Sequence, residues 1–321
     1  MKQNDEIYEN ALKVAHLYYY HGLTTEKIAQ EINFSRPKVS RLLSFARDEG
    51  LVEIKIIDKH DALQPLERQI LEKYRALDVT SIVTAPENLN EYECLQRVSK
   101  FAANYLNSFL TPEQICGISW SRELVEVSKH LIPKRIHGLN FVQLHGNYIS
   151  NKSGFYSRIL YNFTRNYSAK MTILPVPVFF DYPETKTALW QEQTIKKVLE
   201  KLQKASVLIF GVNNITDISS KHLLFDEQFL TDRDRSIMSE QNIIGEISSI
   251  LYRSNGSYAD IALNARSSGP SLDIFKQVKH SICIASGLHL IEPLNAALNA
   301  GYINNLIIDE ITARDLHALQ N

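Results

Sequence analysis

The sequence predicts two domains of different fold class: a small, mainly helical N-terminal domain and a larger, doubly wound α/β domain. The chain has 321 residues, which is too long for one small domain. Residues 1–57 show helical periodicity that ends in a short strand pattern, whereas residues 67–321 alternate short apolar runs with longer amphipathic stretches. Between them, residues 58–66 lose the apolar period and contain Pro65, which indicates a linker.

The composition is that of a globular protein. Hydrophobic residues make up 44% and charged residues 22%, and a formal net charge of −1 decides nothing about nucleic acid. Three widely spaced cysteines exclude a disulfide framework and a zinc-binding motif. The polar N-terminus lacks a signal peptide, and no apolar run reaches the roughly 18 residues that span a bilayer. We therefore expect a cytoplasmic protein with no membrane partner, cofactor or metal.

Two helices are predicted before residue 34. Apolar residues from Ile7 to Tyr20 recur near a helical period, and Gly22 is a suitable stop. Thr24 is expected to cap a second, short helix. Its buried stripe would consist of Ile28, Ala29 and Ile32.

A third helix is predicted from Ser35, its N-cap, to about Glu49. Pro37 then lies in the first turn, where the backbone N–H has no intrahelical partner to lose. The inward residues would be Val39, Leu42, Leu43 and Ala46. Residues 51–57 alternate apolar and charged side chains as a strand does. Three helices and a strand form the winged helix-turn-helix arrangement, whose last helix enters the major groove of DNA.

Positive charge is concentrated on this third helix. Residues 1–60 carry nine basic and nine acidic side chains, yet residues 35–47 contain four basic ones and no acid. Arg36 and Lys38 near the helix start would reach base edges, and Arg47 would hold a phosphate. The alternative is a solvated basic helix face. The predicted DNA-binding residues are Ser35, Arg36, Pro37, Lys38, Ser40, Arg41 and Arg47.

The remainder of the chain predicts a parallel sheet covered on both faces, because strand and helix patterns alternate. Ligands in such sheets bind beyond the carboxyl ends of the strands. The predicted strands are 79–85, 115–120, 140–146, 171–178, 206–212, 281–287 and 304–310. The predicted helices are 91–108, 121–131, 154–167, 186–203, 290–300 and 310–319.

Polar residues at two of these strand ends are candidate ligand contacts. Ser119, Ser121 and Arg122 open a helix after one strand, where they could cradle a phosphate, although such serines are often only caps. Gln143, His145 and Gly146 surround another strand end. A single histidine in such a place is more often a structural hydrogen-bonding residue than a ligand contact.

Further candidates lie at other strand ends. Gly287, followed by His289, stands directly before a helix, so its backbone could approach an anion. Arg266 is expected to be a mobile cation able to clamp a sugar phosphate, and Asp181 to accept hydrogen bonds from sugar hydroxyls. The sequence has no P-loop, GxSxG, HExxH or Rossmann glycine motif, so it carries no enzyme signature.

Both halves resemble the SorC-type sugar-binding transcriptional regulators. The resemblance begins with "ALKVAHLYYYHGLTTEKIAQEINFSRPKVSRLLSFARDEGLVEI" and covers nearly the whole chain. It continues through "GISWSRELVEVSKHL", "FVQLHGN", "LPVPVFFD", "IIGEISS" and "ASGLHLIEPLNAALNAGYINNLIIDEITARDL". The stretches "FVQLHGN" and "LPVPVFFD" resemble the branch that regulates deoxyribonucleoside use.

The resemblance implies a repressor, or less often an activator, of a sugar-catabolic operon. Its larger domain would be similar to sugar-phosphate isomerases and bind a phosphorylated sugar, such as deoxyribose phosphate. It also implies a homodimer or homotetramer on palindromic or repeated operator DNA.

Two positions depart from the family pattern. The family's Gly-Gly-x-x-Lys, whose lysine is expected to hold the phosphate, reads here Ser286 to Leu290. His145 replaces a lysine of the deoxyribonucleoside branch and cannot form an imine with an aldehyde sugar. The missing lysine leaves open the alternative of a regulator with a vestigial pocket. A separate alternative is a sugar-phosphate isomerase or aldolase with an appended DNA-binding domain, its acid and base nominated as Asp181 and His145.

Overall fold

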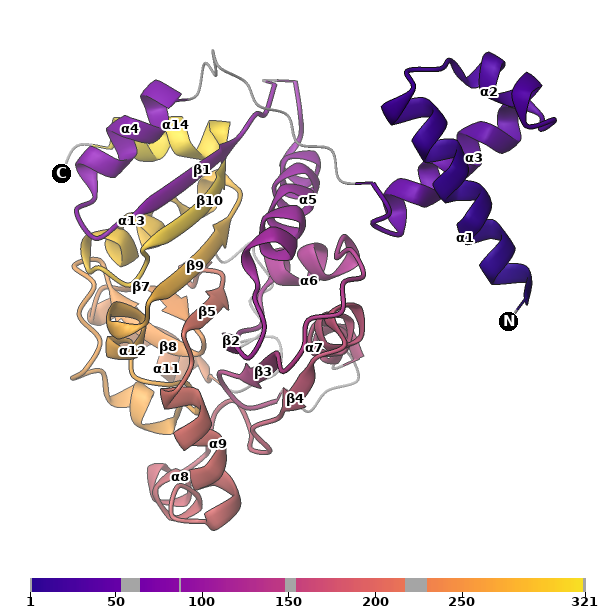
Figure 1. Cartoon of the computed structure of the whole chain (residues 1–321). Helices are drawn as coiled ribbons and strands as arrows, with labels where there is room; N and C mark the ends of the chain where they lie inside the picture. The colour runs from indigo at the N-terminus through magenta and orange to yellow at the C-terminus, as the bar shows by residue number, and fades with distance from the viewer. Residues whose placement is uncertain (1, 53–63, 87, 148–153, 217–229, 320–321) are drawn as a thin grey trace. The chain divides into compact units, whose positions relative to one another are not determined.

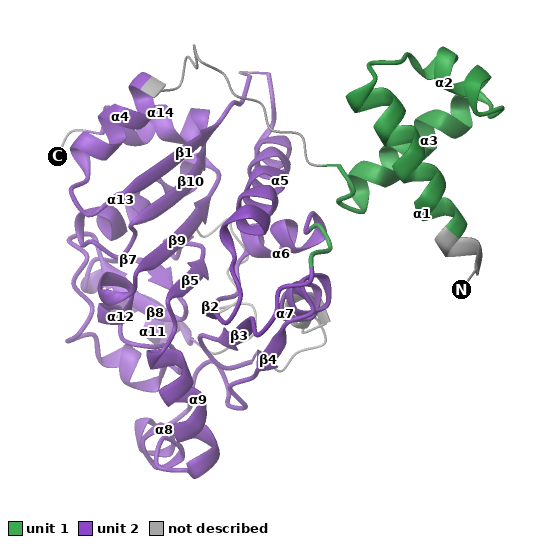
Figure 2. Cartoon of the chain, viewed as in Figure 1, with its two compact units in different colours: residues 1–60, 132–134 green, residues 61–131, 135–321 purple. Residues whose placement is uncertain are grey.

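The computed structural model describes residues 2–52, 64–86, 88–147, 154–216 and 230–319 (Figure 1). The chain forms two compact units (Figure 2). One unit contains residues 1–60 and 132–134, and the other contains residues 61–131 and 135–321. Each unit is described by itself below.

The N-terminal unit contains the three predicted helices. They are α1 (Lys2–Ala15), which continues as the π-helical turn η1 (His16–Tyr20), α2 (Thr25–Glu31) and α3 (Arg36–Asp48). All four residues predicted to face inward from α3 are buried, and they pack against Ala11 and Val14 of α1 and Ile28 of α2. The buried residues predicted for α3 are therefore confirmed, whereas Ile7, Leu12 and Tyr18, part of the apolar period of the first helix, are exposed.

The predicted starts of the second and third helices are confirmed by their caps, whereas the first helix begins at Lys2, earlier than predicted. The Thr24 hydroxyl accepts a hydrogen bond from the Lys27 amide at 3.3 Å, and the Ser35 hydroxyl accepts one from the Lys38 amide at 3.4 Å. Gly22 adopts a positive φ of 65° after the first helix, a conformation that glycine accepts without a steric penalty. The predicted strand 51–57 lies, from residue 53 onward, outside the described residues.

The larger unit contains a seven-stranded parallel sheet in the order β1-β10-β9-β5-β2-β3-β4. Its strands are β1 (Val79–Val83), β2 (Ile115–Ile118), β3 (Asn140–Gln143), β4 (Lys170–Thr172), β5 (Val207–Phe210), β9 (His280–Ala285) and β10 (Asn305–Asp309). All seven predicted strands are present. The fourth is shorter than predicted, because Pro175 and Pro177 lack the N–H group that a strand ladder needs.

Helices cover both faces of this sheet, as predicted for a doubly wound domain. One face packs against α5 (Glu91–Phe109), α6 (Arg122–Lys129) and α7 (Gly154–Tyr167). The other face packs against α4 (Gln64–Lys73), α9 (Gln193–Gln203), α12 (Asp273–Gln277), α13 (Ile291–Asn299) and α14 (Glu310–Ala318). Both faces of the central strands are therefore apolar, as parallel sheets require.

Three predicted boundaries are corrected by the structure. The predicted helix 186–203 is two helices, α8 (Pro183–Leu189) and α9, because the chain is extended at Glu192. Residues 64–66, expected to belong to the linker, form the first turn of α4, and Leu66 is buried in the core. The helix predicted from residue 290 begins as the 3-10 turn η3 (Leu288–Leu290) before α13.

A small antiparallel sheet was not predicted. It consists of β6 (Asn213–Asn214), β7 (Ile243–Ile247) and β8 (Ile250–Arg253), and α11 (Asp232–Glu240) precedes β7. All five residues of β7 are buried, so the strand lacks the alternation of apolar and polar side chains by which antiparallel strands are recognised.

The order of the strands places a topological switch point between β2 and β5. From β2 the chain proceeds outward to β3 and β4, whereas β5 returns to the opposite side of β2 and the next strand of this sheet is β9. Chain segments diverge beyond the carboxyl ends of two such neighbours and leave room for a ligand. The candidate site is therefore sought there.

Candidate functional site

Two of the predicted residues meet at the carboxyl ends of β2 and β3. They are Ser119 and His145, and both are buried. Ser119 Oγ lies 3.3 Å from His145 Nε2. His145 Nδ1 lies 3.1 Å from the carbonyl oxygen of Gly146, which can only accept. Burial lowers the pKa of His145 to about 3, so the ring is neutral at pH 7. Nδ1 therefore carries the proton, and Nε2 accepts from the Ser119 hydroxyl.

Gln143 and Gly146 fix the backbone of the same strand end. Gln143 Nε2 donates to the His145 carbonyl at 2.6 Å and to Asn147 Oδ1 at 2.9 Å. The Gly146 amide donates to Ser268 Oγ at 2.8 Å, across 122 residues of sequence. Both residues thus hold the loop in place through hydrogen bonds that are already made.

The carboxyl end of β5 brings a residue to the switch point that was not predicted. Gly211 lies against the start of α6, where a Cβ would stand 2.7 Å from Ser121 Oγ and 2.8 Å from Glu123 Oε2. Ser121 caps α6 by accepting from the Leu124 amide at 3.2 Å. Glu123 is buried, burial raises its pKa, and its Oε2 has no hydrogen-bond partner among the described residues. A buried oxygen without a partner at a strand end is a position for a ligand donor.

Arg122 and His289 are brought together by a third residue, Glu91. Glu91 Oε1 lies 2.6 Å from Arg122 Nη1 and 3.7 Å from His289 Nδ1. Glu91 is the first residue of α5, so the starts of two helices and the 3-10 turn η3 meet in one ion cluster. The sequence pattern did not indicate Glu91, because acids are common in the first turn of any helix.

A second unpredicted carboxylate, Glu246 of β7, lies in the small sheet. Asn213 Nδ2 donates to Glu246 Oε2 at 2.5 Å, and the Ser249 amide donates to its other oxygen. Burial raises the pKa of Glu246 to about 7. The adjacent Asn214 donates to the carbonyl oxygen of His289 at 2.6 Å, which connects the small sheet to the main strand ends.

Two expectations about this site, for Gly287 and Arg266, are corrected. The Gly287 amide does not face a ligand, because it donates to Asp309 Oδ2 at 3.3 Å and to Thr312 Oγ1 at 3.0 Å. Arg266 is not a mobile cation: it donates to the Phe180 carbonyl at 2.8 Å and pairs with Asp234 at 3.5 Å.

A third correction concerns the acid–base pair nominated for the enzyme alternative. Asp181 is exposed before α8, whereas His145 is buried, and no contact within the described residues joins the two, so the nominated acid–base pair is not assembled. Leu290, at the position of the family lysine, is 1% exposed and packs in the hydrophobic core.

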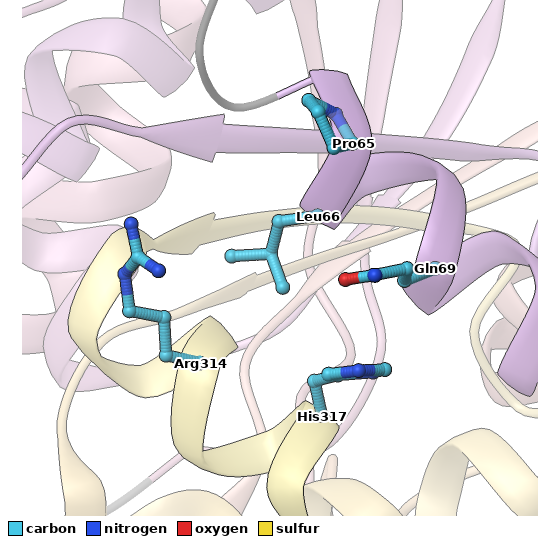
Figure 3. Close-up of a pocket in the computed structure, with 5 residues that line it drawn as sticks. All are labelled: Pro65, Leu66, Gln69, Arg314 and His317. Carbon is cyan, nitrogen blue, oxygen red and sulfur yellow. The ribbon is translucent and has the colours of Figure 1, made fainter.

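Two surface hollows lie elsewhere on the larger unit. One, of about 300 Å³, is lined by Pro65, Leu66 and Gln69 of α4 and by Arg314 and His317 of α14 (Figure 3). The other, of about 450 Å³, includes Glu113, Arg135 and Lys170 and lies at the amino ends of β2–β4. Neither contains a residue of the predicted effector site.

The predicted DNA-binding residues lie along an exposed side of α3. Arg36 pairs with Glu26 of α2 at 2.9 Å, and Lys38 Nζ lies 3.7 Å from the centre of the Phe34 ring. Arg47 donates to Tyr19 Oη at 3.3 Å. The remaining members, Ser35, Pro37, Ser40 and Arg41, are exposed, and Arg41 Nε donates to the Pro37 carbonyl at 3.4 Å.

Neither a membrane span nor a metal site is found in the described part of the chain. Its helices include none that is both long and apolar enough to cross a bilayer. Groups of three or more histidine, cysteine or acidic side chains placed to hold a metal ion are also absent from it.

Residues 59–318 match the Sugar-bind family, described as "Putative sugar-binding domain". The chain belongs to this family. Across 308 residues, or 95% of this chain and 96% of the relative, it is 29% identical to the deoxyribonucleoside regulator of Bacillus subtilis. The family assignment thus rests on nearly the whole larger unit and is supported by a relative of similar length.

Solved structures of the family have the same fold. A domain of a possible sugar-binding transcriptional regulator from Arthrobacter aurescens is 33% identical, with a TM-score of 0.73, over 81% of this chain and 100% of that one. Full-length SorC, the sorbitol operon regulator of Klebsiella pneumoniae, is 24% identical, with a TM-score of 0.76, over 96% of this chain and 97% of that one. The resemblance to SorC-type regulators is confirmed.

Proposed function

We propose that this chain is a transcription regulator that binds operator DNA and responds to a sugar. The observation that carries the proposal is similarity along almost the whole chain. The family match covers nearly all of the larger unit, and the deoxyribonucleoside regulator aligns with 95% of the sequence. The relatives reported above are named as regulators, so the chain is assigned as a regulator and not as an enzyme.

The N-terminal unit is proposed as a winged helix-turn-helix reader, with α3 in the major groove. The capped start of α3 presents Arg36 and Lys38 at its tip, where recognition helices contact base edges. Arg47, in the last turn of α3, is proposed to contact a phosphate of the DNA backbone. Residues 67–321 would then bind the effector and assemble the homodimer or homotetramer, which sedimentation of the full chain distinguishes.

Replacing Arg36 with alanine should weaken operator binding by about 1–3 kcal/mol, the usual loss for an arginine that reads a guanine. Affinity is measured by gel shift with the full chain and the DNA upstream of its own operon. Lys13→Ala is the control, because Lys13 is an exposed cation of α1 outside the proposed interface. Equal losses in the two variants would remove Arg36 from the base-reading set.

The effector is proposed to be a phosphorylated sugar that binds at the β2–β5 switch point. The protein is proposed to be a cytoplasmic repressor that leaves the DNA when this sugar binds. Arg122 and His289 would contact the phosphate, and Ser119 and Glu123 would contact the sugar hydroxyls. Gln143 would hold the loop beside them. Similarity to a deoxyribonucleoside regulator favours deoxyribose phosphate. Because His145 has no primary amine, the sugar would be bound without an imine.

A further inference from the structure

Glu91 occupies the contacts that Arg122 and His289 could otherwise offer to an anionic ligand. Its Oε1 contacts Arg122 at 2.6 Å and His289 at 3.7 Å. A Cβ on Gly287 would stand 3.4 Å from the same oxygen, so the carboxylate also lies against the end of β9. One carboxylate oxygen therefore contacts the Arg122 guanidinium and the His289 ring and lies beside the backbone of Gly287.

The contact is of the kind that a phosphate can replace. The side chains of Glu91 and Arg122 are each about half exposed, and such ion pairs contribute only about 0–1 kcal/mol. Glu91 engages Arg122 through a single nitrogen, Nη1. A phosphate monoester carries about −1.5 to −2 charges and three acceptor oxygens, and it can engage a guanidinium through two parallel hydrogen bonds.

Glu91 can leave this position without unwinding its helix. The first turn of α5 is held by a capping box in which Asn90 Oδ1 accepts from the Glu93 amide at 3.0 Å. In return, Glu93 Oε2 accepts from the Asn90 amide at 2.9 Å. Neither hydrogen bond involves the Glu91 side chain, so a rotation of that side chain leaves the helix start intact.

We propose that Glu91 is an internal competitor of the effector: its carboxylate holds Arg122 and His289 in the free protein, and the phosphate of the sugar displaces it. The proposal rests on the proposed function, since it concerns the same site. It adds selectivity, because an uncharged sugar has no group that can replace the carboxylate on Arg122. Removal of the Glu91 charge should accordingly strengthen phosphate binding.

The test is calorimetric titration of the full-length protein with deoxyribose 5-phosphate and with inorganic phosphate. Glu91→Gln should bind deoxyribose 5-phosphate about fivefold more tightly than the wild type, the gain expected when a half-exposed ion pair no longer competes. Glu113→Gln is the matched control. Glu113 also contacts a histidine, His137, at 2.8 Å, but that pair lines the hollow at the amino ends of the strands.

A double-mutant cycle separates competition from a general charge effect. In an Arg122→Ala background, Glu91→Gln should no longer change the affinity for deoxyribose 5-phosphate, because the two residues act through one contact. Equal affinity of the wild type and Glu91→Gln, or the same gain in Glu113→Gln, would overturn the proposal. If neither protein binds either phosphate, the competitor role fails, whereas the DNA-binding function is still judged separately by the Arg36→Ala gel shift.

Discussion

At the scale of single residues, His145 is neutral because it is buried among partners that need no charge. Its Nδ1 donates to a carbonyl and its Nε2 accepts from a serine, so the neutral ring is fully hydrogen-bonded, and burial makes a second proton costly. The residue therefore orients hydrogen bonds at the end of β3 and supplies no positive charge to an anion. Positive charge at this site comes from Arg122, beside which His289 lies.

Replacing His145 with glutamine should make the protein less sensitive to acid. The unfolded chain binds a proton near pH 6.5 and the folded chain only near pH 3, so stability present above pH 6.5 is lost as the pH falls through this window. Between pH 7 and pH 5 the loss from His145 alone would be about 2 kcal/mol. The melting temperature of the variant should therefore fall less over this range than that of the wild type.

Exposed His137 provides the control for this measurement, because His137→Gln alters a histidine on the surface of the same unit. A melting temperature that falls equally with acid in His145→Gln and in the wild type would contradict a neutral, buried ring.

At the scale of elements, the caps of the helices explain which predictions succeeded. The Ser35 and Thr24 hydroxyls accept hydrogen bonds from amides three residues away. The starts of α3 and α2 can therefore be predicted from short stretches of sequence. The small sheet is different. β7 is buried along its whole length, and only its pairing with β6 and β8 identifies it as a strand.

Ser35→Ala should destabilise α3 by about 1 kcal/mol, because the first turn loses the hydroxyl that accepts from the Lys38 amide. Hydrogen exchange of the α3 amides in the full-length chain measures the change. Ser40→Ala is the matched control, since Ser40 is an exposed serine in the same helix and is not its N-cap. If Ser40→Ala accelerates exchange as much as Ser35→Ala does, the capping role of Ser35 is wrong.

At the scale of the whole molecule, the two units have separate hydrophobic cores, one built from helices and one on both faces of a parallel sheet. Regulation requires that the sites in these units be thermodynamically coupled. Coupling is reciprocal: if a ligand weakens DNA binding by a given factor, DNA must weaken ligand binding by the same factor.

Deoxyribose 5-phosphate should therefore lower operator affinity, and operator DNA should lower the affinity for deoxyribose 5-phosphate by an equal factor. A coupling of 1–3 kcal/mol corresponds to roughly 5–150-fold. Fluorescence anisotropy of labelled operator gives the first factor and calorimetry gives the second. Free deoxyribose is the control, because it lacks the phosphate. A free sugar as effective as its phosphate would contradict the phosphorylated effector.

The sequence by itself determined the elements and their type: seven parallel strands, the three N-terminal helices with their caps, and the basic residues of α3. These follow from periodicity and from contacts between residues three or four positions apart. Only the tertiary structure decided how the strand ends are used. It joined Glu91 to Arg122 and His289, placed Glu123 against Gly211, and committed the Gly287 amide to Asp309 and Thr312. Such contacts join residues from about 20 to nearly 200 positions apart, and the order of strands in the sheet, which no local pattern encodes, brings them together.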